Sequence, residues 1–116
     1  MKIRHILKAK DFADIVKSGE RARGRTLALY VKHGSGEEKT SVGVVVSKEF
    51  APSAVKRNYI KRLVYSYFQD REQPLSQGIR VVVRLIRDVK ELRRKPLSQG
   101  IRGELEALAK KIGIKA

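Results

Sequence analysis

The spacing of apolar residues predicts one helix and three strands in the first three quarters of the chain. Apolar side chains in AKDFADIVKSG, residues 9–19, recur at helical spacing, and the final glycine is a typical helix stop. Three later runs, residues 26–32, 41–48 and 79–87, are rich in the residue types that favour strands. Because the flexible segment HGSGEE separates the first two runs, the pattern predicts that they pair as a hairpin.

The C-terminal part predicts two shorter helices. Asp88 and Glu91 are spaced like a capping box, which predicts a short helix, VKELRRK, that Pro96 ends. Residues 103–112, GELEALAKKI, predict an amphipathic closing helix. With the basic helix described below, the main elements follow the order α-β-β-α-β-α. This order predicts an α+β fold (an α/β sandwich) with one mixed central sheet and helices packed against it.

The heptapeptide PLSQGIR occurs twice, at residues 74–80 and 96–102. A strand pattern follows the first copy, whereas a helix pattern follows the second. We therefore interpret both copies as Pro/Gly turns that lead into different elements, and not as a solenoid repeat.

Residues 54–68, AVKRNYIKRLVYSYF, predict a helix that carries four cations and no acid, with Ser53 as its N-cap. Like charges three or four residues apart repel one another, so this composition is unusual for an ordinary surface helix. On a helical wheel the packing face holds Ile60, Leu63, Val64 and Tyr67, and the opposite stripe holds Asn58, Lys61, Arg62, Tyr65 and Gln69. Guanidinium and ammonium groups bind phosphate, amides hydrogen-bond and tyrosine stacks, so this stripe has RNA-binding chemistry.

The strands predict a second surface by their alternation. In the run 26–32, Leu27, Leu29 and Val31 point toward the core, and the run 79–87 alternates in the same way. The opposite face of these two strands then holds Ala28, Tyr30, Lys32, Arg80, Val82, Arg84 and Ile86. A face that mixes aromatic and basic side chains is typical of proteins that bind single-stranded nucleic acid. Ordinary half-buried packing is the alternative role for Tyr30.

Composition strengthens the nucleic-acid interpretation. The 116 residues suit a single domain, residues 1–116, and 41% of them are hydrophobic, enough for a globular core. Lys and Arg number 27 against 12 Asp and Glu, a net charge of +15 that a polyanion would neutralise. No apolar run reaches the roughly 18 residues of a spanning helix, so no membrane partner is expected. The absence of cysteine and of a secretory signal favours a cytoplasmic location.

The segment VKRNYIKRLVYSYF resembles the signature helix of the bacterial ribonuclease P protein subunit, in which Arg-Asn-Arg is followed by Ile-Lys-Arg-Leu. Other segments resemble that family's elements in the same order, namely KAKDFADIVKSG, LALYV, VGVVVSK, GIRVVVRLI and ELEALAKKI. The resemblance implies an α/β sandwich with a left-handed βαβ crossover, an exception to the usual right-handed rule.

The resemblance also implies a function. Proteins of this family bind the catalytic RNA of ribonuclease P and the 5′ leader of precursor tRNA, and they assist Mg²⁺-dependent leader removal. The implied catalytic-RNA-binding residues are Lys48, Lys56, Arg57, Asn58, Lys61, Arg62 and Tyr65. The implied leader-binding residues are Phe12, Val16, Tyr30, Lys32, Arg80 and Arg84. The expected partners are therefore the catalytic RNA and precursor tRNA, with no obligate protein partner.

Three positions differ from the family pattern. Tyr59 stands in place of the second Arg of Arg-Asn-Arg, Tyr65 stands where another Arg is common, and Glu49 stands where a second Lys is usual. Because tyrosine can stack or donate a hydrogen bond, RNA contacts at Tyr59 and Tyr65 are expected to be redistributed.

The carboxylates and histidines predict no catalytic site in the protein itself. Asp11 and Asp14 are the nearest approach to a metal pair, but acids near a helix start are common for electrostatic reasons. His5 and His33 are isolated in the sequence. Metal-assisted phosphodiester hydrolysis uses clustered carboxylates. We therefore expect no protein-bound metal, and the resemblance assigns the chemistry and the Mg²⁺ to the RNA.

Two other function classes fit parts of the sequence. A generic RNA-binding module, such as a small ribosomal protein, would explain the charge and the stacking residues but not the ordered match along the chain. A protein-only nuclease would need the carboxylate cluster that the sequence lacks. Cleavage of precursor tRNA by protein, RNA or both distinguishes the three classes.

Overall fold

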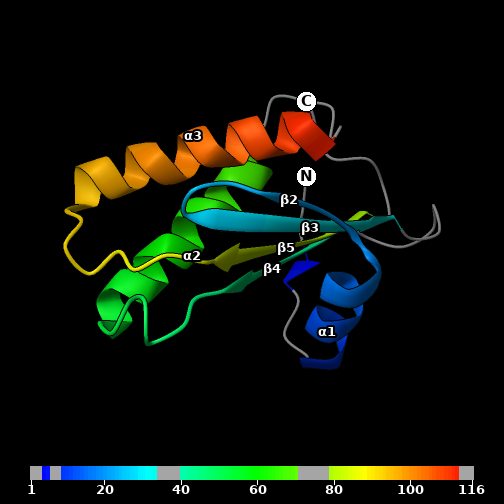
Figure 1. Ribbon diagram of the computed structural model, residues 1–116, viewed down its shortest axis with the longest axis horizontal. Helices are drawn as coiled ribbons and strands as arrows, with labels where there is room; N and C mark the ends of the chain where they lie inside the picture. The colour runs from blue at the N-terminus through cyan, green and yellow to red at the C-terminus, as the bar shows by residue number, and fades with distance from the viewer. Residues whose placement is uncertain (1–3, 6–8, 34–39, 71–78, 113–116) are drawn as a thin grey trace.

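The computed structural model describes residues 4–5, 9–33, 40–70 and 79–112. These residues form a five-stranded mixed sheet and three helices (Figure 1). The elements in chain order are β1 (Arg4–His5), α1 (Ala9–Ser18), β2 (Glu20–Arg23), β3 (Leu27–His33), β4 (Ser41–Val45), α2 (Ala54–Gln69), β5 (Ile79–Leu85) and α3 (Arg94–Ile112). The predicted α+β architecture with one mixed sheet is confirmed.

The helices cover the two faces of the sheet unequally. Helices α2 and α3 pack on one face, where their apolar residues join those of the strands in the main core. Helix α1 packs on the other face, where Ile15 meets Ala28, Tyr30 and Val82 in a smaller cluster. Figure 1 shows α3 above the sheet with α2 beside it, and α1 at the opposite side. The sheet is therefore the middle layer of three.

Local signals located most elements correctly. Helix α1 ends at Ser18, and Gly19 follows at a point where an added Cβ would lie 2.6 Å from the carbonyl oxygen of Ile15. Ser53 is the N-cap of α2, since its Oγ accepts a hydrogen bond from the Lys56 backbone N–H at 3.3 Å. The predicted alternation also holds, with Leu27 and Leu29 in the main core and Ala28 and Tyr30 on the opposite face.

The predicted hairpin between the first two strand runs is wrong. The strand order is β1-β4-β5-β3-β2, so β5 lies between β3 and β4 and pairs antiparallel with one and parallel with the other. Strand β5 is the central strand of the sheet, and both of its edges are hydrogen-bonded. Because it is covered on both faces, Val81, Val82 and Val83 are all buried. The β4–α2–β5 segment is the βαβ unit to which the resemblance assigns a left-handed crossover.

The prediction for the last helix is wrong in its start. No separate VKELRRK helix forms, and α3 begins at Arg94 and continues through Pro96 and the second PLSQGIR copy. A proline in the first turn breaks no helical hydrogen bond, because N–H groups there have no partner within the helix. Leu97, Ile101 and Leu105 then bury one helical stripe, which stabilises the element. Residues 74–78 of the first copy lie outside the described residues.

A half-buried carboxylate connects α3 to the turn between β2 and β3. One oxygen of Glu104, Oε1, accepts hydrogen bonds from the backbone N–H groups of Thr26 at 2.8 Å and Leu27 at 3.1 Å. These two donors would otherwise lack partners beside the helix, and an unpaired buried N–H is costly. The contact fixes α3 across the end of β3.

Gly100 and Gly103 lie inside α3, where an added Cβ would meet no atom within 4 Å. Gly100→Ala should therefore raise the free energy of unfolding by about 0.5–1 kcal/mol, because alanine restricts the unfolded chain without steric cost. Gly19→Ala is the contrasting variant. It should lower the free energy of unfolding, because the added Cβ would lie 2.6–2.7 Å from two backbone carbonyl oxygens. Urea unfolding measures both, and no gain in the Gly100 variant would argue against a continuous α3.

Candidate nucleic-acid interface

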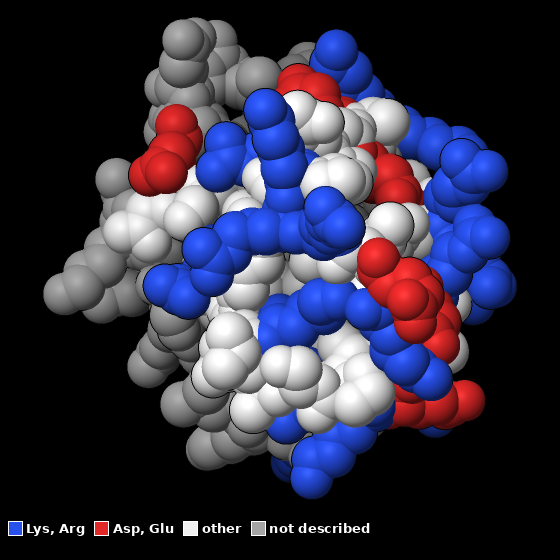
Figure 2. All heavy atoms as spheres, turned by 90° about the vertical axis from the view of Figure 1, so that its left-hand side faces the viewer, with Lys and Arg blue, Asp and Glu red and all other residues white. Residues whose placement is uncertain are grey.

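The exposed side of α2 presents much of the predicted stripe. Asn58 and Arg62 are exposed and Lys61 is half-buried, while the core side of the helix holds Ile60, Leu63, Val64 and Phe68. Lys48 is exposed in the turn that follows β4. Figure 2 views the end of the molecule where α2 and α3 begin, and Lys and Arg cover more of this face than Asp and Glu. This side of α2 therefore combines cations with an exposed amide.

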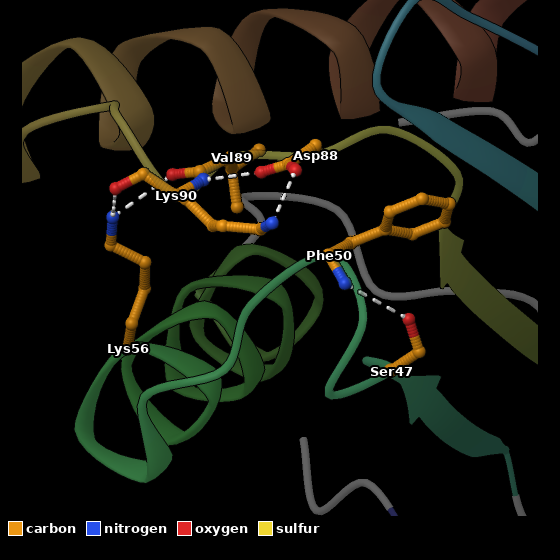
Figure 3. Close-up of polar contacts among 6 residues, drawn as sticks. All are labelled: Ser47, Phe50, Lys56, Asp88, Val89 and Lys90. Carbon is orange, nitrogen blue, oxygen red and sulfur yellow. Dashed lines mark hydrogen bonds and ion pairs between the residues drawn. The ribbon is translucent and has the colours of Figure 1, made fainter.

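Lys56 has a structural task that the sequence did not indicate. Its Nζ donates hydrogen bonds of 2.9 Å to the carbonyl oxygens of Val89, Lys90 and Leu92, in the turn between β5 and α3. Figure 3 shows the first two of these contacts. Asp88 tightens the same turn by accepting from the Lys90 N–H at 2.8 Å, a contact that holds the pKa of Asp88 below its ordinary value. The ammonium of Lys56 thus joins α2 to the start of α3.

Arg57 and Tyr65 are also partly engaged within the protein. One guanidinium nitrogen of Arg57 donates to the carbonyl oxygens of Ala51 at 3.0 Å and Pro52 at 2.7 Å. Tyr65 is half-buried against the main core, and burial raises the pKa of its hydroxyl, although a hydrogen bond with the Val44 backbone acts in the opposite direction. The exposed side chains of the α2 stripe are consequently Asn58, Arg62 and Gln69.

The second predicted surface lies on the sheet face beside α1. Antiparallel register between β3 and β5 places Tyr30 opposite Val82 and Lys32 opposite Arg80. Phe12 and Val16 of α1 are half-buried against the same apolar cluster. The structure therefore brings the predicted leader-binding residues together on one face, which we call the Tyr30 strip. Arg84 lies opposite Ala28 at the end of this strip away from Lys32 and Arg80.

Strand β2 adds two cations to this face that sequence reasoning missed. Arg21 pairs with Tyr30 and Arg23 with Ala28, so both lie on the Tyr30 side of the sheet. They help to line a pocket of about 290 Å³, whose other lining residues are Ala22, Ala28, Tyr30, Phe50, Arg84 and Ile86. The sequence ERAR does alternate, but one buried residue, Ala22, is too weak a signal for a strand.

One acid lies among the cations of this face. Asp14 Oδ2 is 2.8 Å from the Nζ of Lys32 and 3.7 Å from a guanidinium nitrogen of Arg80. The hydrogen bond from Lys32 holds the pKa of Asp14 below its ordinary value. Asp14 therefore neutralises part of the positive charge that Lys32 and Arg80 bring to this face.

The part of the chain that the structure describes contains no group of potential metal ligands and no helix that could span a membrane. Within residues 4–5, 9–33, 40–70 and 79–112, no three His, Asp or Glu side chains lie close enough to hold a metal ion. None of the described helices is long and apolar enough to cross a membrane. The site is thus characterised by basic, amide and aromatic groups.

Comparisons with known proteins give one family. The family model Ribonuclease P matches residues 1–113. The ribonuclease P protein component of Shouchella clausii is 32% identical over 99% of this chain and 90% of its own length. The component of Ralstonia pickettii is 37% identical over 72% of this chain, and that of Pseudanabaena is 36% identical over 64%. The last two matches cover 59% and 64% of those relatives, less than two thirds of their length.

Solved structures of similar shape have related names. The RNase P protein of Staphylococcus aureus superposes with a TM-score of 0.81 at 25% identity, over 97% of this chain and 98% of that one. The RNase P protein of Thermotoga maritima gives a TM-score of 0.71 at 24% identity, over 90% and 94% of the two chains. The second likeness concerns the fold alone.

The bonds of Lys56 predict a loss of stability when its ammonium is removed. Lys56→Met keeps the aliphatic stem but leaves three carbonyl oxygens without their donor, and it should lower the free energy of unfolding by roughly 1–3 kcal/mol. Lys61→Met, the same change further along α2, should shift the free energy of unfolding by less than about 0.5 kcal/mol. Chemical denaturation checks both values, and equal effects would contradict a specific structural role for Lys56.

Proposed function

The chain belongs to the ribonuclease P protein family, and on this premise we propose that it is the protein subunit of a ribonuclease P, which removes the 5′ leader from precursor tRNA. Its partners would be the catalytic RNA and the precursor tRNA. The cysteine-free sequence fits action in the reducing cytoplasm.

One observation carries this proposal, namely two basic surfaces on opposite sides of one sheet. Helix α2 packs on the main-core side and presents Asn58 and Arg62 outward. The strip around Tyr30 lies on the other side, beside α1. A protein with two such surfaces can hold two RNA segments at once, which is what joining a catalytic RNA to its substrate requires.

The two surfaces differ in the RNA that they suit. The α2 stripe is a convex row of cations and an amide, which fits the backbone of a folded RNA. The strip around Tyr30 offers an aromatic ring, apolar residues and flanking cations, which fits unpaired bases and their phosphates. We assign the stripe to the catalytic RNA and the strip to the 5′ leader.

In this proposal the protein binds and positions RNA, and the phosphodiester chemistry belongs to the catalytic RNA with Mg²⁺. Neutralising phosphates with Lys and Arg lowers the repulsion between two RNA molecules, so less Mg²⁺ would be needed for the same assembly. Holding the leader on the strip orients the substrate, which lowers the entropic cost of reaching the active geometry.

Reconstitution tests the proposed function. Cleavage of precursor tRNA should be undetectable with the protein alone, slow with the ribonuclease P RNA alone at low Mg²⁺, and faster when both are present. Cleavage by the protein alone would point to a protein nuclease. RNA binding without faster cleavage would point to a generic RNA-binding module, and either result would contradict the proposal.

Asp14 generates a prediction of increased affinity. Asp14→Asn removes the carboxylate that pairs with Lys32 and Arg80, so precursor tRNA with a leader should bind the holoenzyme roughly two- to fivefold more tightly. Asp11→Asn makes the same charge change on the same helix outside this ion-pair cluster. The gain should vanish for tRNA without a leader, and equal gains in both variants would indicate a general charge effect.

A further inference from the structure

A second pocket lies on the seam between α2 and α3, on the far side of the sheet from the Tyr30 strip. Its volume is about 260 Å³, and it is lined by Tyr59, Arg62, Leu63, Ser66 and Arg94. Four of these residues come from α2, and Arg94 is the first residue of α3. Among the described residues, the lining therefore holds two guanidinium groups and no carboxylate.

Arg94 and Tyr59 hold one another in place. The guanidinium carbon of Arg94 lies 5.0 Å from the centre of the Tyr59 ring, which is a cation–π contact. Tyr59 is half-buried and packs against the main core, so the ring is a fixed support. The position of the Arg94 charge is thus set before any ligand binds.

The charges of this pocket are uncommitted within the described residues. Lys32, Arg80 and Lys90 pair with aspartates, and Lys56 and Arg57 donate to backbone carbonyls. In the part of the chain that the structure describes, neither Arg62 nor Arg94 forms an ion pair or a side-chain hydrogen bond. Two neighbouring guanidiniums without a carboxylate repel one another, and an anion would relieve this repulsion.

The connection to α3 makes the pocket rigid. Lys56 bonds three carbonyl oxygens of the turn that ends just before Arg94, and the Leu97 N–H donates to the Arg93 carbonyl at 3.0 Å to begin the helix. Lys56 is therefore a positioning residue for Arg94. The Arg94 guanidinium is held on the Tyr59 ring, and the planar forks of Arg62 and Arg94 match phosphate geometry.

We propose that this seam pocket binds a backbone phosphate of the catalytic RNA, with Arg62 and Arg94 as its ligands and the Ser66 hydroxyl as a further donor. The ring of Tyr59 supports Arg94 and offers its margin to the adjoining ribose or base. The RNA surface of α2 then continues across the seam onto α3. This inference rests on the proposed function and adds to it a site and a residue, Arg94, outside the α2 stripe.

The first test compares neighbouring arginines in binding to the ribonuclease P RNA transcribed from the same genome. Arg94→Ala should weaken binding roughly five- to twentyfold, as expected for losing a charged hydrogen-bond donor to phosphate. Arg93→Ala removes the same charge from an exposed neighbour that does not line the pocket, and it should weaken binding less than about twofold. In Arg94→Ala, the slope of log K against log salt concentration should decrease in magnitude by about one unit.

A second test isolates the aromatic support. Tyr59→Leu should weaken RNA binding in the parent protein with little change in salt slope, because no charge is removed. In the Arg94→Ala background the same substitution should have a much smaller effect, since the group it supports is absent. Thermal unfolding of each variant shows whether the fold is kept, and Tyr59→Phe should bind RNA like the parent.

The outcomes separate this inference from the proposed function. If the parent protein binds the ribonuclease P RNA and speeds cleavage while Arg94→Ala and Arg93→Ala behave alike, the seam site is wrong and the function stands. If the parent binds that RNA no better than an unrelated structured RNA of equal length, the proposed function itself is wrong. Additive effects of Tyr59→Leu and Arg94→Ala would also overturn the seam site.

Discussion

The antiparallel pairing of β3 with β5 is the constraint on which the two surfaces depend. Its register places Leu29 beside Val83 in the main core and Tyr30 beside Val82 on the other face. Side chains alternate along a strand, so a slip by one residue would put Tyr30 under α2 and expose Leu29. This ladder decides which face of the sheet α2 and α3 cover and which face remains for the aromatic and basic strip.

Alternation is a local property, and the sequence therefore predicted both faces of the strands correctly. Strand order is not local. The hairpin expected between β3 and β4 is absent because β5, more than 30 residues further along, supplies the central strand. The prediction at Pro96 was wrong for a different reason. A proline can end a helix, but it is also common in the first turn of one. Its role was decided by Leu97 and Ile101, which continue a buried stripe through a segment that looked like a turn.

The sequence predicted which residue types form the candidate site. It did not predict which of them make tertiary contacts within the protein. The stripe of Asn58 and Arg62 follows from helical geometry alone and is exposed as expected. No sequence pattern shows that the ammonium of Lys56 would meet carbonyl oxygens 33 to 36 residues away, or that Arg94 would lie over Tyr59. Such contacts need the packing of α3 on α2, which itself depends on where α3 begins. Residues that serve tertiary contacts and residues that serve RNA thus look alike in sequence.

The central claim is that one sheet separates a catalytic-RNA surface from a leader surface. Because the chain has no cysteine, a strand-cleaving iron chelate can be tethered at a single introduced thiol. Val55 of α2 is 69% exposed, and Ala13 of α1 is exposed beside the other face. In the holoenzyme with precursor tRNA, the chelate at Val55→Cys should cut the catalytic RNA, and the chelate at Ala13→Cys should cut the 5′ leader. Cleavage of the same RNA segment from both positions would contradict the account.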